Sequence, residues 1–565
     1  SGTTTLTGAN SYSGATTISN GTLQIGSGGT SGTLGTGAVV DNAALVFNRS
    51  DAVSIANDIS GSGTLTQMGA GALSLTGVNS YAAINNQSAI ATLVNYKGGA
   101  GGSLAYSGAL PSNYFVYVTS ATQYGQLDVS SSSGAMTFSL ASGSSLATGA
   151  YANVVTGVAS SAIASTRSGV LNGYMWQLVQ DTASALNWNL IVTNSTIGPN
   201  SRVFTSQLVD NVDMTLNGGA VVVDKSGVFN NNFALSASPS NGIEAPGGAT
   251  ATFSGVLTDA TSNGSITVSG PQTTVLTGAN TYSGQTTIVS GALQVGSGGA
   301  SGSLGSGDVV NDASLIFNRS DDVTVANGIS GSGGVTQAGA GTTVLTGANS
   351  YSGATTISSG TLQVGAGGSS GTLGTGAVVN NGTLTLNSSV ATSIANDISG
   401  SGALTLVGSG TTTLTGANSY SGATTINSGT LQVGSGGTSG SLGTGAVVNN
   451  AALAFNRSDV ATIANSISGS GALTQMGVGT TILTGANSYS GATTINSGTL
   501  QVGSGGTSGS LGAGAVVNNG ALAFSRSDVA TIANSISGSG ALTQAGSGTT
   551  ILTGANSYSG ATTIN

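Results

Sequence analysis

Short apolar runs separated by glycine, serine and asparagine follow one another along the whole chain. In the stretch that begins at Gly479 the runs are 480–485, Thr493–Ile495, 499–503, 515–517, Ala521–Phe524 and 530–536. Runs rich in β-branched residues and bounded by turn-forming residues are typical of β-strands. No apolar pattern with the 3.6-residue period of an amphipathic helix accompanies them. The sequence therefore predicts an all-β protein without helices of consequence.

The strand pattern repeats along the chain with a fixed period. The tyrosine of the phrase TGANSYSG recurs at even spacing at Tyr282, Tyr351, Tyr420, Tyr489 and Tyr558, and Tyr12 and Tyr81 show the same separation. A fixed period of about 69 residues indicates stacked units that contact mainly their neighbours.

A shorter rhythm divides each repeat. The tripeptides 498–500, 520–522 and 540–542 share a Gly-X-Leu pattern, with intervals of 22 and 20 and a longer interval of 27 before the next Gly-Thr-Leu would fall. Three short strands in each interval predict a parallel β-helix with about three coils per repeat, in which Leu431, Leu453 and Leu473 stack. The alternative is a string of small β-sandwich domains, although no proline-rich or charged linker separates the copies.

The repeat array is interrupted between Tyr81 and Tyr282, which are 201 residues apart. All five prolines lie in or just after this interval, and both tryptophans lie within it. We expect 1–81 and 271–565 to be β-helix repeats and 82–270 to be an all-β module inserted or stacked in the solenoid. An irregular continuation of the β-helix through 82–270 is the alternative.

Composition removes several classes of function. The 565 residues include no Cys and no His, which excludes thiol nucleophiles, disulfides and His-based acid–base catalysis. No metal or other cofactor is predicted. Eight Lys and Arg residues and a net charge of −9 do not form the basic stripe that nucleic acid requires. No apolar run approaches the ~20 residues of a membrane span, and no signal peptide opens the chain.

The segments 339–365 and 408–434 closely resemble the passenger-associated transport repeat of autotransporters. Further copies lie near 1–26, 269–296 and 477–503, with a partial copy at 546–565 and a decayed copy at 70–81. The resemblance implies a right-handed parallel β-helix displayed outside the cell or on a Gram-negative outer membrane, in adhesion, aggregation or biofilm formation. It transfers no catalytic residue. Attachment to the outer membrane is expected only through segments absent from this chain.

The loop Asn-Arg-Ser-Asp recurs once per repeat. It occupies 48–51, 318–321 and 456–459, is altered at 525–528, and loses both charges near Asn387. One hypothesis is a ladder of ligand contacts made by Arg319, Asp321, Arg457 and Asp459. The other is a solvated turn in which Asp and Arg pair weakly.

Aromatic residues supply the other candidate contacts. A row formed by Tyr282, Tyr351, Tyr420 and Tyr489 would grip sugar rings or another fibre, or else each ring covers a corner and caps adjacent coils. Tyr174, Trp176 and Trp188 would form a carbohydrate platform, or else at least half of them face a core.

These features favour an extracellular, surface-displayed β-helical adhesin, stalk or fibre component that binds extracellular glycans or proteins by many weak contacts. Self-association along the fibre axis, with coils continuing in register beyond both ends, is also expected. One alternative is a self-assembling structural filament subunit. Another is a polysaccharide-acting enzyme with its site in 82–270, where Asp210 and Asp213 lie near Arg202 and Lys225. Two acids so close in sequence are more typical of a turn, so no enzyme is predicted.

Overall fold

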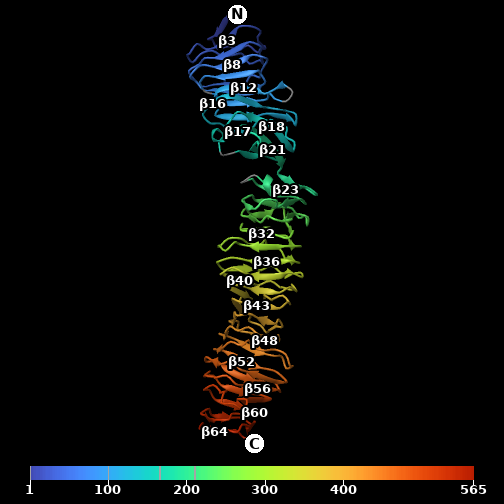
Figure 1. Cartoon of the computed structure of the whole chain (residues 1–565), viewed down its shortest axis with the longest axis vertical. Coiled ribbons are helices and arrows are strands. Elements are labelled where there is room, and N and C mark those ends of the chain that lie inside the picture. Colours follow the sequence, from blue (N-terminus) through green and yellow to red (C-terminus); the bar gives the residue numbers. More distant parts are fainter. Residues whose placement is uncertain (1, 89, 99–100, 165–166, 209–211) are drawn as a thin grey trace. The chain divides into compact units, whose positions relative to one another are not determined.

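The computed structural model describes residues 2–88, 90–98, 101–164, 167–208 and 212–565. It confirms an all-β fold in which short strands pair mainly in parallel, as in a β-solenoid (Figure 1). Ser160–Ala162 and Thr205–Gln207 form single 3-10 turns. The chain divides into two compact units, residues 1–197 with 207–215, and residues 198–206 with 216–565.

Two stacks of strands and a short hairpin form the first unit. One stack, in spatial order, is β1 (Thr3–Leu6), β3 (Thr22–Ile25), β5 (Ala44–Phe47), β8 (Thr64–Gln67), β10 (Ala83–Asn86), β12 (Leu104–Ala109), β16 (Leu127–Ser133), β18 (Gly149–Thr156), β21 (Trp188–Asn194), β20 (Tyr174–Gln180) and β19 (Ser168–Leu171). The other is β2 (Thr16–Ile18), β4 (Val39–Asp41), β7 (Ile59–Ser60), β9 (Leu73–Asn79), β11 (Ile90–Asn95), β13 (Asn113–Val116) and β17 (Thr137–Leu140), with β6 (Val53–Ile55) beside β9. The hairpin is β14 (Val118–Ser120) and β15 (Gln123–Tyr124). The short strands β22 (Thr196–Ile197) and β24 (Met214–Leu216) follow.

The second unit contains overlapping sheets, which we name 2a to 2f. Sheet 2a is β23 (Arg202–Phe204), β25 (Ala220–Val222), β28 (Gly242–Glu244), β31 (Ile266–Ser269), β33 (Thr286–Ile288), β35 (Val309–Asn311) and β38 (Ile329–Ser330). Sheet 2b is β26 (Gly227–Phe229), β29 (Ala251–Phe253), β32 (Thr273–Leu276), β34 (Ala292–Val295), β36 (Ser314–Phe317), β39 (Gly334–Gln337), β41 (Thr355–Ile357), β43 (Val378–Asn380) and β46 (Ile398–Ser399). Sheet 2c is β37 (Val323–Val325), β40 (Thr342–Leu345), β42 (Thr361–Val364), β44 (Thr383–Leu386), β47 (Ala403–Leu406), β49 (Thr424–Ile426), β51 (Val447–Asn449) and β54 (Ile467–Ser468).

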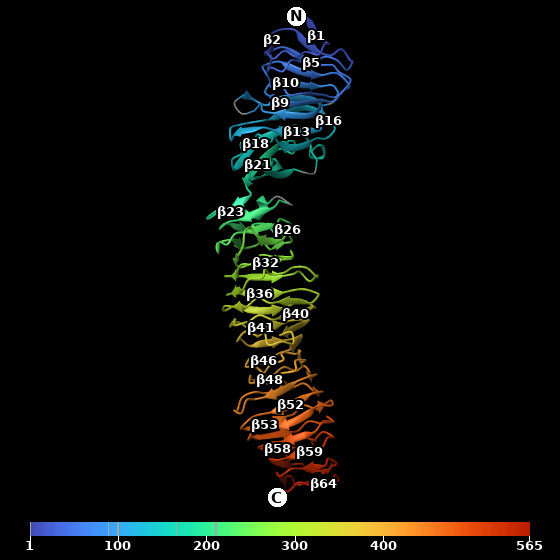
Figure 2. The ribbon, with the colours of Figure 1, turned by 180° about the vertical axis from the view of Figure 1, so that it is seen from behind.

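The remaining sheets of this unit continue the stacks, as seen from behind in Figure 2. Sheet 2d is β45 (Thr392–Ile394), β48 (Thr411–Leu414), β50 (Thr430–Val433), β52 (Ala452–Phe455), β55 (Ala472–Gln475), β57 (Thr493–Ile495), β59 (Val516–Asn518) and β62 (Ile536–Ser537). Sheet 2e is β53 (Val460–Ile463), β56 (Thr480–Leu483), β58 (Thr499–Val502), β60 (Ala521–Phe524), β63 (Ala541–Gln544) and β65 (Thr562–Ile564), and sheet 2f is β61 (Val529–Ile532) and β64 (Thr549–Leu552). The strands β27 (Phe233–Leu235) and β30 (Leu257–Asp259) pair with each other in parallel.

The predicted stack of Leu431, Leu453 and Leu473 is present in sheet 2d, where neighbouring strands pair these residues directly. All three side chains are fully buried, as expected for aliphatic residues that face the inside of the coils. The longest interval of the sequence rhythm, from Leu473 to Leu500, is however not a coil. Leu473 pairs with Thr493, whereas Leu500 lies in sheet 2e opposite Thr481. The reason is that the loop 484–492 crosses a face without a strand, so Thr493 takes the next place in the stack.

The coil length follows from the register of sheet 2d. Starting from Thr412, the successive partners in this sheet are Leu431, Leu453, Leu473, Thr493, Val516 and Ile536. These six coils average about 20.7 residues each, a length typical of one unit of a solenoid. One repeat, such as the stretch from Tyr420 to Tyr489, therefore makes about three and one third coils. Because of the extra third of a coil, equivalent strands of successive repeats lie on successive faces of the three-faced solenoid.

Equivalent strands confirm this advance. The strands β40, β48, β56 and β64 occupy the same place in successive repeats, and they lie in sheets 2c, 2d, 2e and 2f respectively. Along the chain, β61 of sheet 2f lies between β60 of sheet 2e and β62 of sheet 2d. Earlier in the chain, β54 of sheet 2c lies in the same way between β53 of sheet 2e and β55 of sheet 2d, so sheet 2f takes the face that sheet 2c occupied. Features three repeats apart therefore return to the same corner ten coils later, at about 48 Å along the axis for ~4.8 Å per coil.

The interval 82–270 contains two kinds of structure. From β10 to β17 it continues both parallel stacks of the first unit, and the strands from β23 onward are again parallel. Between them β18, β21, β20 and β19 pair in this order as four antiparallel strands. Large aromatic side chains fill the core here, and Phe138 lies edge-on to Trp176 with ring centroids 5.7 Å apart.

Candidate functional site

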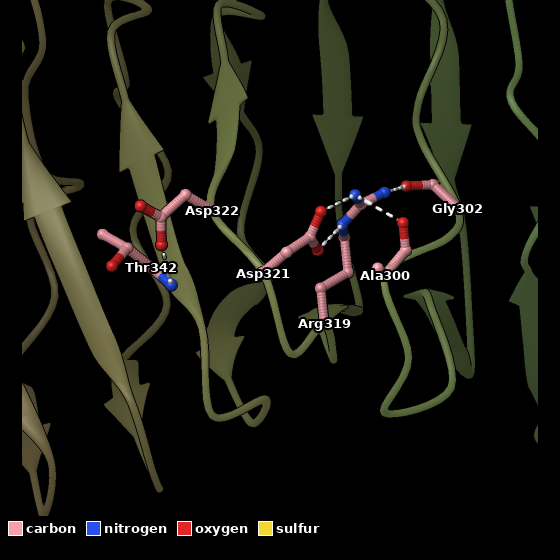
Figure 3. Close-up of polar contacts among 6 residues, drawn as sticks. All are labelled: Ala300, Gly302, Arg319, Asp321, Asp322 and Thr342. Carbon is pink, nitrogen blue, oxygen red and sulfur yellow. Dashed lines mark hydrogen bonds and ion pairs between the residues drawn. The ribbon is translucent and has the colours of Figure 1, made fainter.

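The Arg–Asp loops form clamps within the fold. In Figure 3, Arg319 follows β36 and donates from Nε to Asp321 Oδ1 at 2.9 Å and from Nη2 to Asp321 Oδ2 at 2.7 Å. Its Nη1 donates to the Gly302 carbonyl, and Nη2 also donates to the Ala300 carbonyl at 2.9 Å. The arginine thus ties the glycine-rich loop 296–302 of the preceding coil to its own coil.

The clamp is built from small neighbours. A Cβ at Gly296 would lie 2.7 Å from Arg319 Cγ, and a Cβ at Gly339 would lie 2.0 Å from the Arg319 carbonyl oxygen. Only residues without a side chain at these two positions leave room for the arginine stem and backbone. The Arg319 side chain is 13% exposed, whereas that of Asp321 is 40% exposed.

The same clamp recurs where the loop keeps its charges. The pairs Arg49–Asp51, Arg457–Asp459 and Arg526–Asp528 have N–O distances of 2.6–2.7 Å, and each arginine also donates to the glycine carbonyl that corresponds to Gly302. The hydrogen bond from Arg319 lowers the pKa of Asp321, and Arg457 has the same effect on Asp459. The guanidinium is committed to internal partners, so the carboxylates of Asp321 and Asp459 are what the clamps present to solvent. Beside the first of them, the Asp322 carboxylate accepts a hydrogen bond from the Thr342 backbone N–H at 3.2 Å (Figure 3).

The four tyrosines considered as an exposed row of ligand contacts lie inside the corners, which contradicts that hypothesis. Tyr282, Tyr351, Tyr420 and Tyr489 are each fully buried. The Tyr282 ring lies over Gly305 of the next coil, where a Cβ would come within 2.4 Å of ring carbon Cδ2. The Tyr282 hydroxyl and Thr286 Oγ1 share a hydrogen bond of 2.6 Å, and burial raises the pKa of the phenol. No face of these rings is open for a sugar to stack on, and each ring caps the adjacent coil.

An asparagine completes each tyrosine corner one coil further on. Asn327 Nδ2 donates to the Gly305 carbonyl at 2.8 Å and also to the Gly307 carbonyl. Asn396, Asn465 and Asn534 make the equivalent bonds in later repeats. Sequence reasoning missed these residues, although each follows its tyrosine at the same separation along the chain, as Asn327 follows Tyr282. The stacked order of tyrosine, glycine and asparagine becomes visible only once coils of unequal length are superposed.

The tryptophans of the interrupted interval also face inward. Trp188 is 1% exposed, donates from Nε1 to the Val158 carbonyl at 2.8 Å, and lies under the guanidinium of Arg167 at 4.7 Å. Trp176 is 5% exposed, and Tyr174 beside it is partly buried. This geometry agrees with the hypothesis that these side chains face a core: Trp176 and Trp188 pack inside the antiparallel strands, and neither is exposed as a platform for carbohydrate.

The acidic pair considered for glycan cleavage lies only partly within the described residues, because Asp210 falls outside them. Arg202 forms an ion pair with Glu244 at 3.0 Å. Within the described ranges, no group of three or more His, Cys, Asp or Glu side chains is arranged to hold a metal ion.

Comparison with known proteins identifies the repeats. The family model of the passenger-associated-transport-repeat matches residues 1–25, 65–83, 266–295, 335–364, 404–433, 473–502 and 542–565. The matches fall on the strands that flank the tyrosine corners. The chain carries the repeats of an autotransporter passenger. Passengers of this kind are displayed outside the cell or on the outer-membrane surface.

One relative is an adhesin. Over 61 residues the chain is 54% identical to the adhesin BmaC autotransporter of Brucella suis biovar 1 (strain 1330). This aligned stretch covers 11% of the chain and 2% of that protein. The passenger thus spans a small fraction of the relative's length. No solved structure matches it. In its described part, no helix is both long and apolar enough to cross a membrane.

Proposed function

We propose that this passenger acts as an adhesin-like display solenoid whose repeated acidic clamps contact extracellular glycans or proteins weakly and many at a time. The adhesin relative and the surface display of passengers support a non-enzymatic role in attachment. The exposed carboxylates of the clamps are the candidate contacts, because their arginines are used internally.

The observation that carries the proposal is the one-face advance of each repeat. Because of it, the clamps at Arg319 and Arg526 share one corner about 48 Å apart for ~4.8 Å per coil, whereas the clamp at Arg457 lies on another corner. A flat surface can engage the first two together, and simultaneous engagement raises apparent affinity without any new contact. The third clamp faces a different direction and contacts other partners around the solenoid.

The test uses charge-neutral substitutions in the full chain. Asp321→Asn and Asp528→Asn, singly and together, keep a hydrogen-bond acceptor for the arginine but remove the exposed charge. Attachment of the variants to cells or glycan-coated surfaces is measured under flow, with Asp459→Asn as the matched control. Either substitution on the shared corner should reduce attachment to a flat surface several-fold, as expected when paired contacts become single. Equal effects of all three substitutions, or no effect of any, would contradict the proposal.

A further inference from the structure

One repeat differs from the others at the clamp. Where the other copies have Phe, Arg and Asp, as in Phe317, Arg319 and Asp321, this repeat has Leu386, Ser388 and Val390. The Ser388 hydroxyl instead accepts a hydrogen bond from the Val390 N–H at 3.2 Å. Ser388 makes no bond to the preceding glycine-rich loop in the described structure.

A pocket of this repeat extends further toward the glycine-rich loop than its counterpart one repeat earlier. A cavity of about 450 Å³ lies between the loop 371–375 and the edge strand β45, with Val364, Leu373, Leu386 and Ile394 in its walls. Gly371 and Ser388 also line it. The corresponding hollow one repeat earlier, about 420 Å³, is lined by Phe317 and does not reach Gly302 or Arg319. Val364 is accordingly 6% exposed, against 1% for its equivalent Val433.

The vacated positions define what would fill the pocket. In the clamped repeats an arginine stem covers the first glycine of the loop, and Nη1 donates to the carbonyl of the last. Here the three atoms nearest to a Cβ built at Gly365 all belong to the backbone, whereas at Gly296 the second nearest is Arg319 Cγ. The Gly371 carbonyl has no donor among the described residues. The pocket therefore lacks a ring, a short stem and one hydrogen-bond donor.

Charge decides the class of ligand. The arginine and its aspartate are lost together, so the walls are apolar and the rim carries hydroxyl and amide groups such as Ser388, Asn387 and Thr372. A cation entering this site would lose its water without gaining a carboxylate, which is unfavourable. A neutral aromatic group with one hydroxyl donor replaces both the missing ring and the missing hydrogen bond.

We propose that this pocket binds a tyrosine side chain of a partner polypeptide. The ring lies against Leu373, Leu386 and Ile394, and the phenol donates a hydrogen bond to the Gly371 carbonyl. Val390, which is 42% exposed at the same loop, gives the partner backbone an apolar contact outside the cavity. The site is independent of the acidic clamps, because it occupies the corner at which the clamp is missing.

Calorimetric titration of the full chain with 4-methylphenol tests the chemistry of the pocket. One saturable site per chain is expected, toluene should bind about tenfold more weakly because it lacks the donor, and ethylguanidinium should not compete. Absence of a saturable site, or displacement of 4-methylphenol by ethylguanidinium, would overturn the proposal.

Variants that fill this pocket, or that extend the equivalent hollow one repeat earlier, test where 4-methylphenol binds. Leu386→Phe restores the residue of the other copies, and Ser388→Arg combined with Val390→Asp restores the clamp. Each should weaken binding of 4-methylphenol by about tenfold or more. The triple variant Phe317→Leu, Arg319→Ser, Asp321→Val should extend the equivalent hollow to the Gly302 carbonyl and free that carbonyl, and should therefore raise the stoichiometry from one to two. Circular dichroism establishes whether each variant is folded. If the clamp variant does not fold, Leu386→Phe decides the outcome, because other repeats have phenylalanine at this position, as in Phe455 and Phe524. Unchanged binding in Leu386→Phe would overturn the assignment.

A peptide distinguishes a partner polypeptide from a free phenol. A Gly- and Ser-flanked peptide with a central Tyr should bind more tightly than 4-methylphenol, and the same peptide with Phe should bind as weakly as toluene. If 4-methylphenol binds and the Tyr peptide does not, the partner is a free aromatic molecule and the polypeptide proposal is wrong.

Discussion

The ring of Tyr351 lies directly on Gly374 of the following coil. A Cβ built at Gly374 would fall 2.3 Å from the Tyr351 carbonyl oxygen and 2.4 Å from ring carbon Cδ2. Asn396 closes the same corner from the next coil by donating to the Gly374 carbonyl at 2.8 Å. Three consecutive coils are thus joined at one point by a ring, a glycine and an amide.

Gly374→Ala should destabilise this corner by on the order of 3 kcal/mol, because the added methyl meets backbone as well as ring atoms. Gly368→Ala is the matched control, since nothing lies within 4 Å of its Cβ position. Urea unfolding and hydrogen exchange of the amides around Tyr351 measure the difference. Similar losses in both variants would show that the close approach does not limit the corner.

Replacement of Tyr351 separates its ring from its hydroxyl. Tyr351→Phe removes the 2.8 Å hydrogen bond to Thr355 and should cost about 1 kcal/mol. Tyr351→Ala leaves a cavity and should cost about 3–5 kcal/mol. Thermal unfolding compares the two, and an alanine variant as stable as the phenylalanine variant would place the ring outside the core.

Asp41 makes the stability of the first unit depend on pH. It is fully buried where Asn311, Asn380 and Asn449 stand in other repeats, and burial raises the pKa of its carboxyl group. A folded-state pKa above the unfolded value, ordinarily near 3.8, means that this group stabilises the fold at low pH and that the contribution is lost as pH rises through the folded pKa. Asp41→Asn should therefore raise the unfolding temperature at pH 7 and have little effect near pH 3. The Asn side chain can donate as Asn311 does to the Gly334 carbonyl at 2.8 Å. A gain of the same size at both pH values would contradict this account.

Loss of the clamp should loosen the glycine-rich loop. Lys in place of Arg319 cannot make the paired bonds to Asp321 while also reaching the Gly302 and Ala300 carbonyls. Arg319→Lys should therefore speed cleavage of the loop 296–302 by elastase. Arg202→Lys is the control, since Arg202 is 62% exposed and pairs with Glu244 at the surface. Equal cleavage rates would show that the clamp does not hold the loop.

The sequence predicted the elements and the direction of stacking well. The apolar residues Leu431, Leu453 and Leu473 recur at nearly even intervals, and this spacing sufficed to place them in one stack. The prediction that the third interval, from Leu473 to Leu500, forms one coil was wrong. Leu500 looks equivalent to Leu473 in the sequence, but the loop before it crosses a face without a strand, so Thr493 pairs with Leu473 instead. Whether a loop or a strand crosses that face depends on packing against neighbouring coils, which the spacing does not report.

The candidate contacts were harder to predict for the same reason. Tyr282 stands among small polar residues that read as an exposed turn, and the glycine that receives its ring, Gly305, lies a full coil further along the chain. The charges of Arg319 and Asp321 identified a pair, but not that the arginine reaches back to the Gly302 carbonyl of the preceding coil. Both features depend on which residues lie one coil apart.

The central claim is that each repeat makes three and one third coils, and disulfide trapping tests it most directly, because the chain has no cysteine of its own. Thr474 and Thr494 are paired on neighbouring strands of sheet 2d, at a spacing of ~4.8 Å that a disulfide can bridge. Thr474→Cys combined with Thr494→Cys should form an intramolecular disulfide on oxidation, detected by mass spectrometry of the digested protein. Thr474→Cys combined with Gln501→Cys, the pair that a coil from Leu473 to Leu500 would bring together, should stay reduced. A disulfide in the second variant and none in the first would contradict the account.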